Sequence, residues 1–381
     1  MKLTTLLSVS LAACLLTPSF GQSFDRSVRQ VENREPSIPR PEQEAQVKVK
    51  LENLHKKMGK RPNILWIIVD DMGYGDPGCY GGGEAAGAAT PHLDALAADG
   101  LKLTSCYSQQ TCTPTRSAIL TGRLPVRTGL TRPILAGDKI TKNPWADEVS
   151  LPTLLGKAGY ATVLTGKWHV GEAEGMRPQD VGFDEFYGFY PAQKEVSQRV
   201  DARRYPGIAL DPLLMAAFEG LGIGHHLVHG FKGGRTVKVS SIESTEDMGR
   251  ADQALADFSI AKIKELAAKD KPFFLEHCFM KVHCDNFANP DLAGLSSSKY
   301  PYKDAIVEVD LHIGALRAAL EEAGVLENTL IFLTSDNGPQ MDAWPDAGYT
   351  PFRGAKGTTF EGGVRVPGIA NWKGMIEPGR V

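Results

Sequence analysis

Residues 111–122 combine a cysteine, a proline and an arginine at a spacing that could support chemistry. The segment reads Thr-Cys-Thr-Pro-Thr-Arg-Ser-Ala-Ile-Leu-Thr-Gly. Pro114 fits the first turn of a helix, which places Cys112 at a helix N-terminus, where free N–H groups and the positive dipole end favour an anion. Arg116 follows one turn later on the same face and can reach back toward Cys112. The alternative is a cysteine that caps a helix beside a surface arginine.

Two acidic pairs follow apolar runs of the sequence. Asp70-Asp71 comes directly after the run 63–69, and Asp336-Asn337 follows the run 330–333 after two residues. Because open α/β sheets bind ligands beyond the carboxyl ends of their strands, these side chains are expected to meet. Three carboxylates and an amide oxygen suit a hard divalent cation, Ca²⁺ or Mg²⁺. Taken singly, each pair could instead be a helix cap or a turn.

The elements that must position these residues alternate between strand and helix. Short apolar runs predict buried strands, and longer periodic segments between them predict helices, which together indicate an α/β domain on a largely parallel sheet. The predicted strands are 63–69, 161–164, 273–275 and 330–333. The predicted helices are 92–98, 251–269 and 302–323. Residues 198–248, rich in glycine and polar groups, are expected to be an insertion.

Composition restricts the partners of the chain. The 381 residues are 42% hydrophobic, enough for one large α/β core or two domains. With 42 basic and 45 acidic residues the net charge is −3, so neither nucleic acid nor an anionic membrane is expected as a general partner. An anionic substrate would have to be held by a few local charges.

The N-terminal residues predict export. Residues 1–21 have a positive start, an apolar stretch and small residues before Gln22, as in a cleaved signal peptide, and are too short for a membrane span. Leu11-Ala12-Ala13-Cys14 also resembles a lipobox, so a lipid anchor at Cys14 is the alternative. Residues 22–60 are expected to be a polar tether, with a possibly helical stretch from Glu42 to Lys57. No Asn-x-Ser/Thr sequon is present, which favours a bacterial envelope, periplasmic or extracellular.

Several motifs, in order along the chain, resemble type I sulfatases. The segment 112–116 is similar to their Cys-x-Pro-(Ser/Thr/Ala)-Arg signature, and Gly159–His169 resembles the second signature. Residues 273–283 resemble the family's strand that ends in a histidine, although the usual Pro-His pair is replaced by Val282-His283. Residues 350–367 resemble the Arg-Gly-x-Lys segment. Independent matches in one order are far more specific than any single motif.

The resemblance implies an alkaline-phosphatase-like fold, in which helices flank a large central, mostly parallel sheet. The catalytic domain would cover residues 61–381, and a small C-terminal antiparallel subdomain that family members carry is expected to be missing. Within the motifs, Gly166 should let the backbone run close to a ligand. Lys167 and His169, two apart in an extended segment, should face the same way.

The resemblance also implies the chemistry. Cys112 would be oxidised to Cα-formylglycine by a formylglycine-generating enzyme, and four of the five cysteines after the signal could then pair. The family favours Ca²⁺, with Mg²⁺ possible. The implied metal ligands are Asp70, Asp71, Asp336, Asn337 and the modified residue 112.

The remaining roles concern the substrate. Arg116 and Lys167 would stabilise the hydrated aldehyde, and His169 would orient its hydroxyls. His283 is the implied general acid, with His277 as its competitor, and Lys356 would bind the sulfate.

These roles predict a sulfuric ester hydrolase that cleaves aryl or carbohydrate sulfates through a covalent sulfated formylglycine intermediate. One alternative is a phosphate or phosphonate ester hydrolase of the same superfamily. Another is a relative that binds sulfated glycans without catalysis.

Overall fold

The computed structural model describes residues 39–381, apart from 136–137, 139, 141–142, 221–225 and 270. The chain divides into two compact units, residues 1–49 and 50–381. The predicted signal peptide, Cys14 and most of the predicted tether lie outside the described residues. The helical stretch expected from Glu42 to Lys57 is present as α1 (Pro41–Met58).

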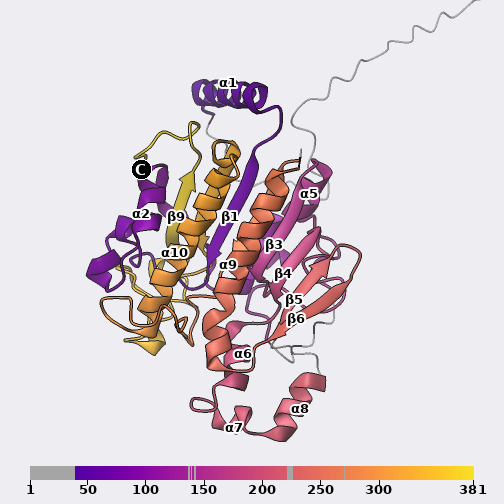
Figure 1. Ribbon diagram of the computed structural model, residues 1–381, viewed down its shortest axis with the longest axis vertical. Helices are drawn as coiled ribbons and strands as arrows, with labels where there is room; N and C mark the ends of the chain where they lie inside the picture. The colour runs from indigo at the N-terminus through magenta and orange to yellow at the C-terminus, as the bar shows by residue number, and fades with distance from the viewer. Residues whose placement is uncertain (1–38, 136–137, 139, 141–142, 221–225, 270) are drawn as a thin grey trace, which may run out of the picture. The chain divides into compact units, whose positions relative to one another are not determined.

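A nine-stranded sheet forms the centre of the second unit, in the described part of the chain. Its order is β2-β9-β8-β1-β7-β3-β4-β5-β6 (Figure 1). The five strands from β8 to β4 are parallel, and two antiparallel strands extend each edge. The strands are β1 (Asn63–Val69), β2 (Leu101–Tyr107), β3 (Ala161–Lys167), β4 (Glu185–Phe189), β5 (His226–Phe231), β6 (Thr236–Ser241), β7 (Phe273–Cys278), β8 (Thr329–Ser335) and β9 (Arg365–Asn371). The predicted mostly parallel α/β fold is therefore confirmed.

Helices cover both faces of this sheet. The α-helices after α1 are α2 (Pro91–Ala98), α3 (Cys112–Thr121), α4 (Pro125–Thr128), α5 (Leu151–Lys157), α6 (Gln193–Val200), α7 (Pro206–Ala209), α8 (Pro212–Gly220), α9 (Thr245–Ala267), α10 (Pro301–Glu322) and α11 (Glu361–Val364). Helices α9 and α10 lie side by side across the face seen in Figure 1. Short 3-10 turns complete the connections.

The alternation of β1 explains how its sequence builds two cores. Leu65, Ile67 and Val69 point to the side of α2, α9 and α10, where they join the largest apolar cluster. Ile64 and Trp66 point to the opposite side, where they pack with residues of α3 and β3. A strand buried on both faces needs a continuous apolar run, which is the pattern of residues 63–69.

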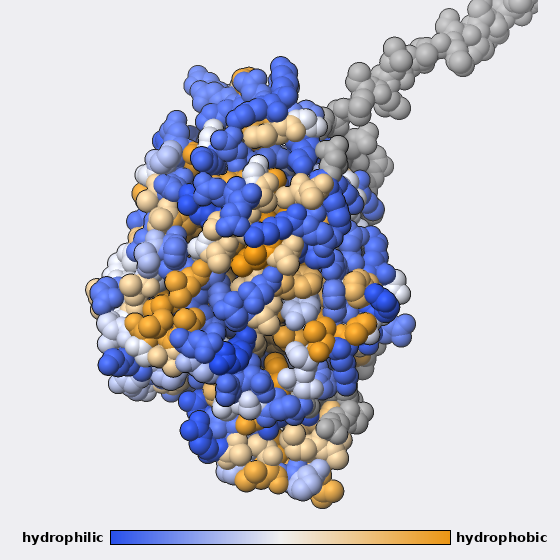
Figure 2. Space-filling model, viewed as in Figure 1, coloured by the Kyte–Doolittle hydropathy of each residue, from blue (hydrophilic) through white to orange (hydrophobic). Residues whose placement is uncertain are grey.

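Residues 198–248 contain α7, α8 and the strands β5 and β6. Strand β5 pairs antiparallel with β4, so this region enlarges the central sheet. Apolar side chains gather on the surface of α7 and α8, at the lower end of Figure 2. Leu210 and Leu213 there are 67% and 82% exposed.

Two further findings concern the export predictions. No described helix is long and apolar enough to cross a membrane. The five cysteines after the signal, Cys79, Cys106, Cys112, Cys278 and Cys284, are all free thiols in the described structure. The pairing of four cysteines that the sequence allowed is therefore not formed.

Candidate active site

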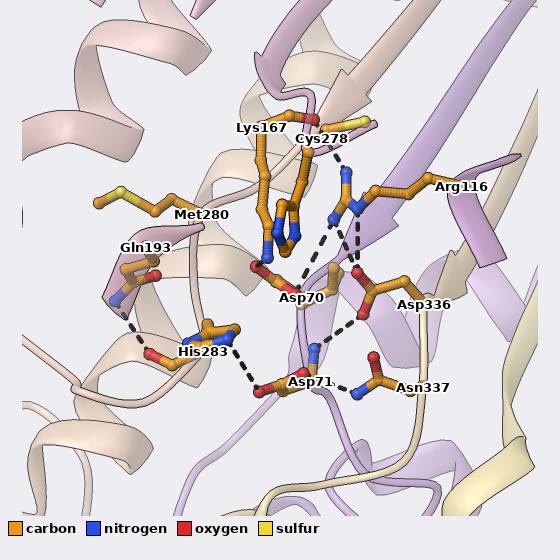
Figure 3. A network of polar contacts seen from close by, with 12 residues as sticks. Asp70, Asp71, Arg116, Lys167, Gln193, Cys278, Met280, His283, Asp336 and Asn337 are labelled. Carbon is orange, nitrogen blue, oxygen red and sulfur yellow. Dashed lines mark hydrogen bonds and ion pairs between the residues drawn. The ribbon is translucent and has the colours of Figure 1, made fainter. Parts of the chain in front are cut away.

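The acidic residues predicted from the sequence converge at the carboxyl ends of β1 and β8. These strands are parallel neighbours in register, Val69 opposite Ser335, so the residues after them lie side by side. Oxygens of Asp70, Asp71 and Asp336 lie within 4.8 Å of one another, and all three side chains are buried (Figure 3). No other cluster of this kind occurs among the described residues.

The side chain of Asp71 accepts hydrogen bonds from two residues. The backbone at Asp71 is left-handed, with φ 64°, a conformation that aspartate tolerates better than most residues. Asn337 Nδ2 donates to Asp71 Oδ1 at 2.6 Å, and Lys356 Nζ donates to Oδ2 at 2.7 Å. Burial alone would raise the pKa of Asp71, but Lys356 and then His283 bring it below its ordinary value.

Cys112 begins α3, as its spacing from Pro114 predicts. Its side chain is buried at 2% exposure. Burial raises the pKa of the thiol, although Lys167 and Lys356 act in the opposite direction. A nucleophilic cysteine needs a lowered thiol pKa, so this environment does not suit a thiolate nucleophile.

Arg116 contacts the acidic cluster. Its Nε and Nη2 atoms donate to Asp336 Oδ2 at 3.0 and 2.8 Å, and Nη1 donates to the carbonyl of Lys167 at 2.9 Å. The hydrogen bonds of this guanidinium thus go to Asp336, which directly follows β8, and to the last residue of β3, while the sequence suggested a reach back toward Cys112. Because three of its N–H donors bind fixed acceptors, the buried guanidinium of Arg116 has one defined position.

Lys167 and His169 were expected to face the same way in an extended segment, but the backbone between them differs from that expectation. Strand β3 ends at Lys167, whose ammonium pairs with Asp70. His169 follows in a left-handed conformation with φ 55°, so the segment is not extended there. Its Nε2 lies 2.8 Å from the carbonyl of Ile134, and its buried Nδ1 has no hydrogen-bond partner. Burial, then Lys167, holds the pKa of His169 well below its usual value.

Gly166 was expected to let the backbone run close to a ligand, which stays a prediction; the close approach that the structure describes is to the protein itself. The φ of Gly166 is 102°, and a Cβ added there would lie 1.7 Å from the carbonyl oxygen of Cys278. The close approach is therefore to the neighbouring strand β7. The glycine lets β3 and β7 pair while the chain turns toward Lys167.

The structure separates the two candidate histidines. His283 Nε2 lies 3.8 Å from Asp71 Oδ2 (Figure 3). Its Nδ1 faces the carbonyl of Cys284. His277 lies within β7 and its Nδ1 is 2.8 Å from the hydroxyl of Ser259 on α9. Burial lowers the pKa of His277 to about 3 and also holds the pKa of His283 well below its usual value. Position therefore separates the two: His277 is buried against α9, and His283 faces the acids.

Lys356 lies in the loop before α11 and pairs with Asp71, whereas Lys167 pairs with Asp70. Besides the 2.7 Å contact of its ammonium with Asp71, the backbone N–H of Lys356 donates to Pro339 at 3.0 Å. The next residue, Gly357, donates to the carbonyl of Gln110 at 2.7 Å, which ties the loop to the segment before α3. Lys356 is therefore held near Cys112 by backbone contacts.

The donor set fits a hard cation. Asp70 Oδ1 and Asn337 Oδ1 are buried and have no hydrogen-bond partner among the described residues. An orphaned buried oxygen is costly unless something else satisfies it. Two such oxygens beside three clustered carboxylates are the ligands that Ca²⁺ or Mg²⁺ prefers.

Two supporting residues were not identified from the sequence. Thr115 donates from its hydroxyl to the carbonyl of Asp336 at 2.5 Å and accepts from the N–H of Gln109 at 2.9 Å. Gln193 on α6 donates from Nε2 to the carbonyls of His283 and Asp285 at 2.9 and 2.7 Å. Thr115 lies inside a motif that the sequence analysis quoted. Gln193 carries no local signal, because its partners are about 90 residues away.

The chain resembles known proteins over most of its length. The family model described as Sulfatase matches residues 62–381. N-acetylgalactosamine-6-sulfatase of Canis lupus familiaris is 34% identical over 334 residues, covering 84% of this chain and 59% of that protein. Arylsulfatase A of Homo sapiens is 35% identical over 326 residues, covering 84% and 61%. The chain thus spans about three fifths of these relatives.

Solved structures agree with this relationship. PsFucS1 sulfatase from Pseudoalteromonas sp. has a TM-score of 0.88 and 53% identity, covering 94% of this chain and 71% of that one. Ps i-CgsB, solved in complex with k-i-k-neocarrahexaose, has a TM-score of 0.69 and 26% identity, covering 84% and 68%. With the family model matched over residues 62–381, the chain belongs to the sulfatase family, as its type I signatures predicted.

Proposed function

We propose that this chain hydrolyses sulfate esters, with a nucleophile made from Cys112. The observation that carries the proposal is the position of Cys112 at the start of α3, within the electrostatic reach of Lys167, Lys356, Asp336 and Asp70. The thiol itself has a raised pKa, which disfavours direct thiolate attack; we therefore propose formylglycine, which the sulfatase signature at 112–116 implies, as the nucleophile. This modification would be made by a formylglycine-generating enzyme.

A divalent cation fits the site, and we propose Ca²⁺, with Mg²⁺ as the alternative. Asp70, Asp71, Asp336 and Asn337 would hold it, together with the modified residue 112. When bound, such a cation lowers the pKa of a hydroxyl ligand and polarises an ester oxygen.

The protein's own residues have separate tasks in this proposal. Arg116 holds Asp336 in place, and Lys167 offsets the charge of Asp70. Lys356 brings a positive charge to the side of the site that receives the sulfate, and His169 orients the nucleophile. His283 Nε2 is the atom that would pass a proton to the departing alcohol oxygen.

We propose sulfated carbohydrates as the natural substrate class. N-acetylgalactosamine-6-sulfatase is a relative at 34% identity, and Ps i-CgsB was solved with k-i-k-neocarrahexaose. Aryl sulfates would then serve as test substrates. We also propose that the protein is exported to the periplasm or extracellular space through residues 1–21, followed by a tether (22–60) and the catalytic domain (61–381). Mass analysis of the mature N-terminus tests the export step.

The decisive experiment compares Cys112→Ala with the wild type on one aryl sulfate and one aryl phosphate. Both proteins are produced together with a formylglycine-generating enzyme. We expect the wild type to release sulfate faster than phosphate and Cys112→Ala to release neither. In the active protein, the peptide containing residue 112 should be lighter than the cysteine form by about 18 Da, because sulfur is exchanged for oxygen with loss of two hydrogens.

Cys79→Ala is the matched control, since Cys79 is a partly buried thiol outside the site. It should keep full turnover. Sulfate release by Cys112→Ala at the wild-type rate would refute the proposed nucleophile. Faster cleavage of the phosphate would support the phosphate or phosphonate hydrolase instead. Sulfate-ester binding without turnover by protein that carries the modification would support the non-catalytic binder.

A further inference from the structure

A buried ion pair lies directly behind the segment that carries His283. Lys281 and Glu308 are 2% and 0% exposed, and the ammonium of Lys281 pairs with the Glu308 carboxylate. The same ammonium donates to the carbonyl of Gly249 on α9 at 2.7 Å. None of the roles assigned above uses this pair.

The pair belongs to a network that joins α9 and α10. Asp252 on α9 accepts from the backbone N–H groups of Met280 and Lys281 at 2.8 and 3.2 Å. On α10, His312 Nε2 lies 3.3 Å from Glu308 Oε1. The backbone of residues 280–281 is thus bound by α9. The side chain of Lys281 is bound by both α9 and α10.

The backbone of the same segment is also hydrogen-bonded to the backbone of Asp70, which directly follows β1. The backbone N–H of Asp70 donates to the carbonyl of Lys281 at 3.1 Å, and the N–H of Val282 donates to the carbonyl of Asp70 at 2.7 Å. His283 follows immediately, with Nε2 3.8 Å from Asp71 Oδ2. Any shift of residues 280–282 would therefore move His283 relative to the acidic cluster.

Stability alone explains this arrangement poorly. Burying two charges costs desolvation energy that their attraction often fails to recover, and apolar replacements of similar volume are frequently neutral or stabilising. A buried pair with several fixed hydrogen-bond partners does, however, define one backbone geometry.

We propose that Lys281, Glu308 and Asp252 are positioning residues for His283, which set the distance between its Nε2 and the departing oxygen of the substrate. This inference rests on the proposed function, because it concerns proton transfer to that oxygen. None of the three residues touches the substrate; they act through the backbone of residues 280–282. A displacement of about 1 Å at a reacting group is enough to cost a large factor in rate.

The test uses two sulfate esters that differ in their need for a proton. A nitrophenyl sulfate has a good leaving group that departs without protonation, whereas an alkyl or sugar sulfate needs a general acid. His283→Gln should lose about 10²-fold or more on the second ester and much less on the first. The double variant K281M/E308Q, which removes both charges together and leaves neither alone, should lose about 10-fold on the second ester only.

Two comparisons separate positioning from a merely structural role. Combined with His283→Gln, the double variant should add no further loss on the sugar sulfate, since both act on one step. Asp252→Asn, which keeps one of the two acceptor oxygens and turns an amide donor toward the other backbone N–H, provides a second variant if the double variant does not fold. Lys262→Met is the matched control: Lys262 is a buried lysine of α9 whose ammonium pairs with Glu265 at 2.5 Å and with Glu185 at the start of β4 at 2.9 Å, and it makes no hydrogen bond or ion pair with residues 280–282. It should lose equally little on both esters.

Equal losses on the two esters, or losses that multiply with those of His283→Gln, would overturn the positioning role while wild-type turnover stays intact. A wild type that turns over neither ester would instead refute the proposed function itself. The two failures are therefore distinguishable in one set of assays.

Discussion

Glu276 offers a quantitative test of the electrostatics beneath the site. It lies in the centre strand β7 at 2% exposure. Its Oε2 has no hydrogen-bond partner among the described residues, and Oε1 receives only the weak donor Cys278 Sγ at 3.6 Å. Burial raises its pKa to about 7, even though Arg116 acts to lower it. We predict that Glu276→Gln stabilises the fold at alkaline pH.

The size of this stabilisation follows from the difference between the pKa values of Glu276 in the folded and unfolded states. The pKa is about 7 in the folded protein and near its ordinary value of 4.5 in the unfolded chain. At about 1.4 kcal/mol per pH unit, this difference corresponds to about 3 kcal/mol. Because the folded pKa is the higher one, the folded state binds the proton more tightly, and the wild type loses stability as pH rises through this range. Glutamine resembles the neutral acid and avoids that loss.

The assay is urea unfolding of both proteins at pH 5 and pH 8. The free energy of unfolding of Glu276→Gln minus that of the wild type should grow by about 2–3 kcal/mol between the two pH values. All other groups titrate alike in both proteins and cancel in this difference. A difference that stays constant, or that falls as pH rises, would refute the reasoning.

Glu308→Gln is the matched control for this experiment. Glu308 is also buried, but His312 and Lys281 lower its pKa against the effect of burial. A carboxylate with a lowered folded pKa stabilises the protein above its ordinary pKa, and loses that contribution only as pH falls further. Glu308→Gln should therefore cost stability, to nearly the same extent at pH 5 and pH 8.

Three further predictions concern the site and its support. Ca²⁺ at about 100 times its dissociation constant should raise the free energy of unfolding by about 2.7 kcal/mol, measured by calorimetry against chelator-treated protein, and Asp336→Asn should reduce the effect. Gly166→Ala should lower the free energy of unfolding in urea by about 2 kcal/mol or more, because the added Cβ would meet the Cys278 carbonyl. As a control, Gly156→Ala, at a helical position where the added Cβ has nothing within 4 Å, should raise it by about 0.5–1 kcal/mol. Arg116→Met should cost about 3–5 kcal/mol in the same assay, since it leaves Asp336 buried without its main partner.

The interior of the sheet could be predicted from the sequence, but its edges could not. The run 63–69 gave β1 with its observed bounds, because a strand buried on both faces is apolar throughout. Strand β6 has no buried residue, and β2 is largely half-exposed or exposed. Such edge strands resemble polar loops in sequence. The glycine and polar groups of residues 198–248 suggested an insertion and did not reveal the strands β5 and β6, which extend one edge of the sheet.

The sequence could place some of the candidate site residues, because Asp70 and Asp336 directly follow buried strands and Cys112 begins a helix. The hydrogen-bond partners of these residues could not be predicted as well from the sequence. Sequence spacing suggested that Arg116 reaches Cys112, four residues away, yet its guanidinium binds Asp336, 220 residues away. Sequence spacing predicts which side chains share a helical face. It does not predict which of several nearby acceptors binds a buried guanidinium, because that depends on which strands meet at the sheet edge.

Charge balance explains why these partners had to come from distant segments. The converging ends of β1 and β8 bring the buried carboxylates of Asp70, Asp71 and Asp336 together. Uncompensated buried carboxylates at such distances would be strongly unfavourable. The compensating ammonium and guanidinium groups come from α3, β3 and the loop before α11, one to each acid. Local sequence around the acids cannot supply these cations, so the fold that assembles the acids must also assemble the cations, and a substitution on either side disturbs both.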